Sequence, residues 1–102
     1  MELSLSDLKQ LVNVSSSHSF QIGESYLIRT VTFYYTGRIK AITDSDLLLE
    51  NAAWIADTGC FHNALKTGDL AEIEPFVTEV IVPRGGIIDA TQWQHDLPRM
   101  QK

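Results

Sequence analysis

Cysteine is almost absent from this sequence. Cys60 stands alone among 102 residues, so the chain cannot form an internal disulfide, which suits a reducing compartment. Long hydrophobic runs are absent too, and nothing approaches the roughly 20 apolar residues that a membrane-spanning helix needs. The first residues, MELSLSDLKQ, lack a basic segment followed by an apolar stretch, so they do not resemble a secretory signal. These absences predict a cytoplasmic protein with no membrane partner.

Basic residues are also scarce. Eight Lys and Arg stand against 13 Asp and Glu, which gives a formal net charge of −5. Nucleic-acid affinity comes largely from Lys and Arg that displace counterions from phosphates, so this balance argues against non-specific coating of DNA. A local basic patch remains compatible with it. The length and the 44% of hydrophobic residues are typical of a globular protein, and we expect residues 1–102 to form a single domain.

Catalytic and metal-binding constellations are missing. Cys60 and His62 have Cys-x-His spacing, but the other two histidines lie far away in the sequence and zinc needs about four ligands. Asp44, Asp46 and Glu50 resemble part of an acidic metal loop, yet no glycine follows at the required place. The Gly-Gly pair precedes no Lys-Ser/Thr of a phosphate loop. We therefore predict a protein that is not an enzyme and holds no metal or cofactor.

The patterns that are present predict one helix followed by strands. Apolar residues recur at helical spacing in residues 4–14, at Leu5, Leu8, Leu11 and Val12. The predicted helix either covers an open end of the fold or docks a partner. From Tyr26 the chain becomes rich in aromatic and β-branched residues, which favour strands. The predicted strands are YLIRTVTFYY (26–35), RIKAI (38–42), LLLENAAWI (47–55), FVTEVIV (76–82) and IIDATQW (87–93).

Turn residues separate these strands. TDSD (43–46) predicts a turn, because Asp and Ser side chains bond nearby backbone amides. Arg84-Gly85-Gly86 predicts a tight turn in which glycine adopts positive φ. No turn residue occurs within Tyr26–Tyr35, so the first hairpin either is built differently or turns at Thr36-Gly37. The third strand is expected to bend or to end near Asn51.

Two further segments complete the predicted fold. DTGCFHNALKTG (57–68) predicts a short inserted helix, with Asp57 or Thr58 as its N-cap and Gly68 at its C-terminal stop. The tail, residues 94–102, is polar and contains a proline, so we expect it to be flexible and frayed. Five short antiparallel strands with these helices predict an all-β fold. A barrel is its most economical form, because closure removes the sheet edges.

Two motifs resemble the signatures of the Sm-like (LSm) family. GRIKAITDSDLLLEN (37–51) is similar to the first signature, which has a glycine in strand two, a polar turn and a leucine-rich third strand. VIVPRGGIIDA (80–90) is similar to the second, in which apolar alternation leads into Arg-Gly and out into another strand. The resemblance covers roughly residues 4–92. It implies a small, five-stranded, strongly bent antiparallel barrel at about residues 26–93, preceded by the N-terminal helix.

The resemblance also implies a function. Members of this family assemble into rings by pairing the fourth strand of one subunit with the fifth strand of the next, and single-stranded RNA is their ligand. Arg84 and Gly85 match an RNA-contacting position of the family. The sequence departs from the first signature where Thr43 replaces the usual aspartate and Leu47 replaces a base-recognising asparagine. The first half of the family's uridine pocket is therefore not evident.

Self-assembly has support from the sequence itself. FVTEVIV (76–82) carries Glu79 as its only charge and contains no internal proline, so it lacks the usual protections of a free edge strand. Such an edge is either covered within the domain or paired with another chain. Heterologous pairing that closes produces a ring. The expected interface comprises Phe76, Val77, Thr78, Val80, Ile81, Val82, Ile87 and Ile88.

The remaining candidate residues each have two interpretations. Arg38 and Lys40 either extend a basic surface around Arg84 or simply face solvent. Trp54, Trp93 and the Phe33–Tyr35 run either stack on bases or fill a core or interface. We predict a non-enzymatic, ring-forming module that binds single-stranded RNA. The alternative is a structural or adaptor ring for protein partners in a phage-derived or bacterial assembly, which the weak first motif and the acidic charge favour.

Overall fold

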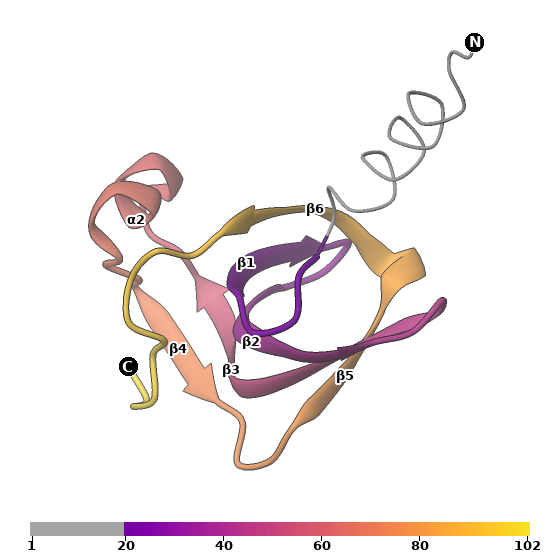
Figure 1. Ribbon diagram of the computed structural model, residues 1–102. Helices are drawn as coiled ribbons and strands as arrows, with labels where there is room; N and C mark the ends of the chain where they lie inside the picture. The colour runs from indigo at the N-terminus through magenta and orange to yellow at the C-terminus, as the bar shows by residue number, and fades with distance from the viewer. Residues whose placement is uncertain (1–19) are drawn as a thin grey trace, which may run out of the picture.

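A computed structural model describes residues 20–102, so the predicted helix at 4–14 lies outside the described residues. This part of the chain is mostly antiparallel strand, with one α-helix, as the mainly-β prediction required. Figure 1 shows the elements, which are β1 (Ser25–Thr30), β2 (Tyr34–Ile42), β3 (Asp46–Asp57), α2 (Phe61–Thr67), β4 (Glu72–Pro75), β5 (Val80–Pro83), the 3-10 turn η1 (Arg84–Gly86) and β6 (Ile87–Gln92).

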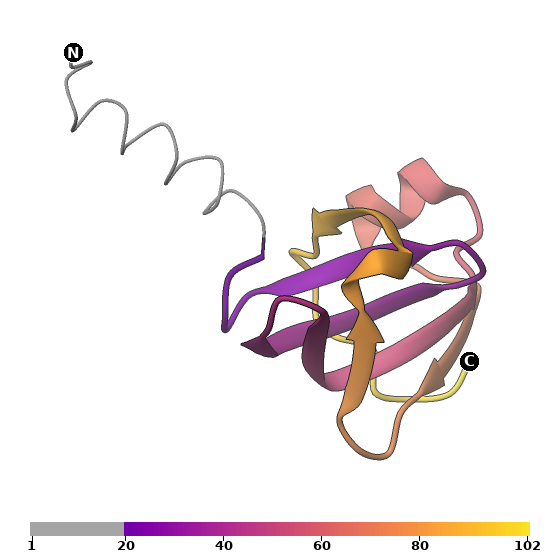
Figure 2. The same cartoon turned by 90° about the vertical axis from the view of Figure 1, so that its right-hand side faces the viewer.

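The strands of residues 20–102 form one curled sheet that is not closed into a barrel. The prediction of five strands is wrong, because it omits β4 and the sheet has six. Its order is β4-β3-β2-β1-β6, and β5 pairs with β3 off this path. On its edge away from β2, the long strand β3 pairs with two strands, since Asp46–Leu49 pair with β5 and Ala53–Asp57 pair with β4. The predicted closure is wrong because η1 directs the chain from β5 to β6 at the far side of β1, so that β6 pairs with β1 and not with β5 (Figures 1 and 2).

A close approach of β2 and β3 explains the glycine in the second strand. A Cβ atom at Gly37 would lie 3.1 Å from the Cβ of Ala52 and 3.2 Å from that of Leu49. The β2–β3 register shifts between Thr36 and Arg38, and Asn51 adopts a φ of 50° while the strand continues past it. The predicted irregularity near Asn51 is therefore confirmed, as a bend within an unbroken strand.

The predicted strand at 26–35 is wrong, since residues 31–33 form the turn of a hairpin between β1 and β2 that contains no Gly, Asn or Asp. The Thr30 amide donates to the Phe33 carbonyl at 2.8 Å, and the Phe33 amide donates to the Thr30 hydroxyl at 3.0 Å. This threonine hydroxyl does what an Asx side chain does in other turns. The alternative turn at Thr36-Gly37 is wrong, because Gly37 lies within β2 and pairs with Tyr26.

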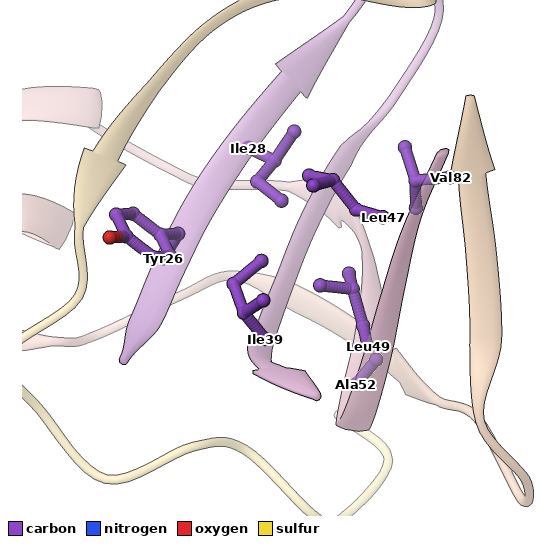
Figure 3. Packing of buried hydrophobic residues seen from close by; sticks show 7 residues of the cluster. All are labelled: Tyr26, Ile28, Ile39, Leu47, Leu49, Ala52 and Val82. Atoms are coloured by element: carbon purple, nitrogen blue, oxygen red, sulfur yellow. The ribbon is translucent and has the colours of Figure 1, made fainter. Parts of the chain in front are cut away.

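The sheet is buried on both faces, by two separate clusters. The inner cluster, seen in Figure 3, lies between the first strands and β5 and consists of Tyr26, Ile28, Ile39, Leu47, Leu49, Ala52 and Val82. The outer cluster uses α2 and the segment after β6 in addition to strands, and consists of Leu27, Ala53, Ile55, Ala64, Leu70, Ile73 and Trp93. Successive residues of a strand point to opposite faces, so Leu27 and Ile28 belong to different clusters.

The inserted helix is shorter than its predicted range. Gly68 ends it as predicted, with a φ of 81° and its amide donating to the Ala64 carbonyl at 2.8 Å. The predicted caps Asp57 and Thr58 are wrong, because the helix begins after Cys60, which makes no side-chain cap hydrogen bond. Asp57 is the last residue of β3, and its carboxylate accepts from the Gly59 amide at 2.8 Å instead.

The C-terminal tail is docked, and the prediction that it frays is wrong. The amide and carbonyl of Lys102 both bond the backbone of Ile73 in β4, at 3.0 Å each. Leu97 packs against the outer cluster, and the Trp93 indole N–H donates to the Asp96 carbonyl at 3.1 Å. The tail is held because the edge of β4 offers unpaired backbone groups, which no local pattern in residues 94–102 reveals.

Two predictions around β5 also need correction. The predicted strand at 76–82 is broken, since 76–79 form a loop and only Val80–Pro83 form β5. The Phe76 amide donates to the Ala52 carbonyl at 2.8 Å, and this anchors the loop to β3. Arg84-Gly85-Gly86 forms a 3-10 turn in which neither glycine has positive φ. A 3-10 turn reverses the chain with ordinary negative φ, so glycine is not required there for its conformational freedom.

Candidate binding surfaces

The two motif turns lie side by side, although 41 residues separate their contacting members. The Arg84 amide donates to the Ser45 carbonyl at 2.8 Å, and its guanidinium Nη1 donates to the Thr43 carbonyl, also at 2.8 Å. The predicted turn at 43–46 is confirmed, with the Asp46 amide donating to the Thr43 hydroxyl at 2.9 Å. We call Thr43–Asp46 together with Arg84–Gly86 the turn junction.

The space around the two glycines of the turn junction is unoccupied. A Cβ atom at Gly85 or Gly86 would meet nothing within 4 Å. Arg84 is half-buried, and the carbonyl of Thr43 fixes one end of its guanidinium. The predicted pair Arg84 and Gly85 therefore sits at an accessible and ordered corner of the fold.

Arg38 and Lys40 do not join this corner. The Arg38 Nε donates to Glu50 at 2.8 Å across the β2–β3 ladder. The Lys40 ammonium donates to Glu79, which raises the pKa of Lys40 through the hydrogen bond and the carboxylate charge. Neither side chain bonds the turn junction within the part of the chain that the structure describes. Carboxylates already satisfy both cations, so they add little to a phosphate-binding surface.

The predicted interface residues divide between surface and core. Val77, Ile81 and Ile88 are 97%, 63% and 55% exposed. Val82 is only 2% exposed and belongs to the inner cluster, because it faces Leu47 across the β3–β5 ladder. Thr78 is exposed, and the other predicted members are partly buried against the inner cluster, namely Phe76, Val80 and Ile87. Val82 is unavailable to a partner's side chains.

The sheet has three outer strand edges, on β4, β5 and β6, and they differ in whether another segment pairs with them. The outer edge of β4 is occupied by Lys102 through two backbone hydrogen bonds. Within residues 20–102, β5 pairs only with β3 and β6 pairs only with β1, so each has a second edge with no partner strand. These two edges carry the exposed side chains of Ile81 and Ile88.

An aromatic pocket opens at the other half of β3, on the face of the inner cluster. Its volume is about 300 Å³, and its walls are Phe33, Tyr35, Trp54, Glu74, Pro75 and Phe76. Strand register assembles it, because Tyr35 pairs with Trp54 and Trp54 pairs with Glu74. The sequence pattern pointed to Phe33, Tyr35 and Trp54 as stacking candidates but not to Glu74 or to the grouping.

Trp93, the other aromatic candidate, takes no part in this pocket. It is 4% exposed in the outer cluster and meets His95 edge-on, with ring centroids 5.0 Å apart. The interpretation of Trp93 as a core residue is therefore correct.

The indole Nε1 of Trp54 and the hydroxyl of Thr36 are buried without a hydrogen-bond partner among the described residues.

A smaller pocket of about 240 Å³ lies beside α2 and is crossed by an ion pair. Arg29 Nε donates to the Asp89 carboxylate at 3.1 Å between β1 and β6. This hydrogen bond, with the opposite charge, holds the pKa of Asp89 below its usual range and raises the pKa of Arg29. The pair neutralises itself, so the pocket offers no net charge to a ligand.

Cys60 and its neighbours form no assembled site. Cys60 is an exposed free thiol at the start of α2. In residues 20–102, no three His, Cys, Asp or Glu side chains gather in a way that could hold a metal ion. In the same range, no helix has the length and apolar character needed to cross a membrane.

Models of known protein families and curated proteins provide no match to this chain.

Proposed function

We propose that this chain is a non-enzymatic, divergent Sm-like binding module that assembles with copies of itself into a ring and serves as a structural or adaptor element for protein partners. The observation that carries the proposal is the contrast among sheet edges. The tail occupies the edge of β4, whereas the edges of β5 and β6 have no partner strand within residues 20–102.

The exposed residues on these edges support self-assembly. Free edge strands are normally protected from pairing by charged side chains, by proline or by a covering segment, because their unpaired backbone groups attract other strands. Ile81 and Ile88 instead place large apolar side chains on the two open strands. If β5 of one copy pairs with β6 of the next, the same heterologous contact repeats around the assembly, and a rotation that closes gives a ring.

The arrangement of turns supports the Sm-like part of the proposal. The two motifs that resemble the family signatures meet at the turn junction, through Arg84 and Ser45. The glycine of the first motif, Gly37, lies where β2 and β3 approach closely and where β3 bends. The open sheet is a departure from a closed barrel, and pairing with a neighbour would occupy the edges that it leaves.

Charge supports protein partners over RNA. Arg38 and Lys40 are paired with Glu50 and Glu79, and the chain carries a net charge of −5. Single-stranded RNA is the second candidate ligand, and the turn junction is what favours it. In a ring, the copies of Arg84 would gather into one anion-binding region.

The native mass of the full chain tests the proposal. We expect a defined multiple of 11.4 kDa in native mass spectrometry and sedimentation. Ile81→Lys places a charge on the β5 edge and should release monomers that keep their far-UV circular dichroism. Ile22→Lys is the matched control, since Ile22 is 66% exposed but lies outside β5 and β6, and it should leave the mass unchanged. A wild-type monomer at micromolar concentration contradicts the proposal.

The same preparation decides between protein and RNA. A ring that co-purifies with RNA, and whose affinity for a single-stranded oligonucleotide falls with salt and in Arg84→Ala, would favour the second candidate. We expect a ring that does not bind single-stranded oligonucleotides even at low salt.

A further inference from the structure

The aromatic pocket has an unusual composition for a surface recess. Four aromatic rings line it, from the β1–β2 hairpin, β2, β3 and the segment after β4, and one carboxylate is the only charged group among the lining residues. The rings belong to Phe33, Tyr35, Trp54 and Phe76, and the carboxylate belongs to Glu74. Segments distant in sequence thus bring four aromatic rings and one carboxylate to the wall of a single pocket.

The rings present walls of different orientation. Phe33 meets Trp54 edge-on, with centroids 4.9 Å apart and planes at 83°. Tyr35 and Phe76 lie nearly parallel, at 16°, with centroids 6.0 Å apart. An occupant of the pocket therefore meets rings from more than one direction, as a roughly spherical group requires.

We propose that this pocket binds a methylated ammonium group. The face of an aromatic ring carries negative partial charge and attracts a cation that lies within about 6 Å of the ring centroid. Methyl groups spread the positive charge and weaken hydration, so such a cation enters an apolar pocket more easily than a free ammonium ion, which must give up strong hydrogen bonds to water.

Glu74 distinguishes a cation from other occupants. Glu74 is a half-buried residue that lines the pocket, and its carboxylate accepts a hydrogen bond from the side-chain amide of Gln101 at 3.3 Å. A neutral apolar group would cover this carboxylate without compensating its charge, which is costly. A phosphate would be repelled by it. A methylated ammonium group satisfies the charge and the rings together.

The methylated ammonium group has two natural sources, a free small cation such as choline or a methylated lysine side chain of a polypeptide. A volume of about 300 Å³ accommodates the head group from either source. This inference goes beyond the proposed assembly and does not depend on it, because every lining residue comes from a single chain.

A charge-matched titration tests the inference. The full chain is titrated with choline and with 3,3-dimethyl-1-butanol, its neutral carbon isostere, and binding is followed by tryptophan fluorescence and calorimetry. We expect choline to bind about tenfold more tightly or better, since the rings and Glu74 act on the charge and not on the shape. Equal affinity for the two compounds, or no binding of choline by the folded chain, overturns the inference.

Matched variants locate the site. Phe33→Ala and Glu74→Gln should each weaken choline binding severalfold, and Phe61→Ala should leave it unchanged. Phe61 is the appropriate control because it is 42% exposed, close to the 41% of Phe33, and lines a different pocket. Weakening by Phe61→Ala equal to that of Phe33→Ala would place the cation elsewhere and overturn the assignment.

Two further measurements separate sources and proposals. A peptide with trimethyllysine is compared with the same peptide with unmodified lysine. If the trimethyllysine peptide binds more tightly than choline, a polypeptide is the source of the group, and if it binds more weakly, a free cation is the source. Both outcomes support the methylated ammonium site. Native mass is measured on each sample. A monomer that binds choline contradicts the proposed ring alone, and a ring that does not bind it contradicts this inference alone.

Discussion

The two faces of the sheet are buried by different means. On the inner face, every member of the cluster comes from a strand or from the bend within β3. On the outer face, the strands meet Ala64 of α2, Leu70 of the following loop and Trp93 after β6. The inner cluster is therefore a product of strand pairing, whereas the outer cluster exists only when the helix and the tail have docked. Two clusters that are equally buried can therefore depend on different segments of the chain.

β1 records this difference in its sequence. Tyr26, Leu27 and Ile28 are buried one after another, without the alternation of a strand that has one wet face. A continuous apolar run is typical of strands covered on both sides. This run marks β1 as central, but it does not say which segments provide the two covers.

The largest expected effect comes from neighbouring truncations in β1. Leu27→Ala and Ile28→Ala should each lower the free energy of unfolding by about 2–5 kcal/mol, because both side chains are fully buried. Urea denaturation of each variant, with and without deletion of residues 94–102, measures the coupling. The deletion should reduce the cost of Leu27→Ala, whose cluster the tail covers, and should leave that of Ile28→Ala unchanged. Equal coupling for both would mean that the two clusters form one core.

A smaller effect is expected where β2 and β3 approach most closely. Gly37→Ala places a methyl group within 3.2 Å of Leu49 and Ala52 and should cost about 1–3 kcal/mol by overpacking the inner cluster. Gly85→Ala is the control, since its added Cβ meets nothing within 4 Å and its φ is not positive. Thermal denaturation compares them. A tolerated Gly37→Ala would show that the bend of β3 absorbs the methyl group.

Arg99 links the tail to the loop before β5 and should matter less than either core. Its guanidinium donates to the carbonyl of Ala52 at 2.9 Å and to that of Phe76 at 3.1 Å. Arg99→Ala should cost about 1–2 kcal/mol, because the partly buried carbonyl of Ala52 loses a charged donor. Arg99→Lys should recover part of this, since an ammonium reaches one carbonyl but does not span two. Amide hydrogen exchange at residues 76–79 should increase in both variants.

The smallest expected effect has the opposite sign. Thr36 faces Leu27 and Ala53 on the outer side, is fully buried, and its hydroxyl has no hydrogen-bond partner among the described residues. Thr36→Val keeps the shape and removes the unsatisfied oxygen, so it should raise stability by about 1 kcal/mol. Chemical denaturation measures it. A destabilised Thr36→Val would indicate that the hydroxyl is satisfied in solution.

Local chemistry determined much of the strand content. The β-branched and aromatic runs located most of β3 and β6, but they joined β1 to the start of β2 in one predicted strand and missed β4. The Thr43–Asp46 turn and the Gly68 stop lie where the sequence predicts them. These features depend on neighbours in the chain, whose interactions a sequence displays directly. The break at Phe76–Glu79 was missed, because an apolar stretch reads as one strand until its partner, β3, shows where the pairing ends.

The candidate sites depended more on tertiary structure. The sequence singled out Arg84, which lies at the turn junction, but it did not show that Glu50 and Glu79 neutralise Arg38 and Lys40. It named three of the four pocket rings as stacking candidates without their arrangement, since the β2–β3 and β3–β4 registers bring them to Glu74.

The amino-acid sequence by itself determined that residues 20–102 are mainly β, that a turn lies at Thr43–Asp46, and that the inserted helix ends at Gly68. Only the tertiary structure decided that the sheet stays open, that the tail occupies the edge of β4, and that the edges of β5 and β6 are left without partner strands in the described part of the chain. The physical reason is one of range. Turn and strand preferences act between adjacent residues, whereas register, docking and edge pairing are decided by contacts between segments far apart in the chain.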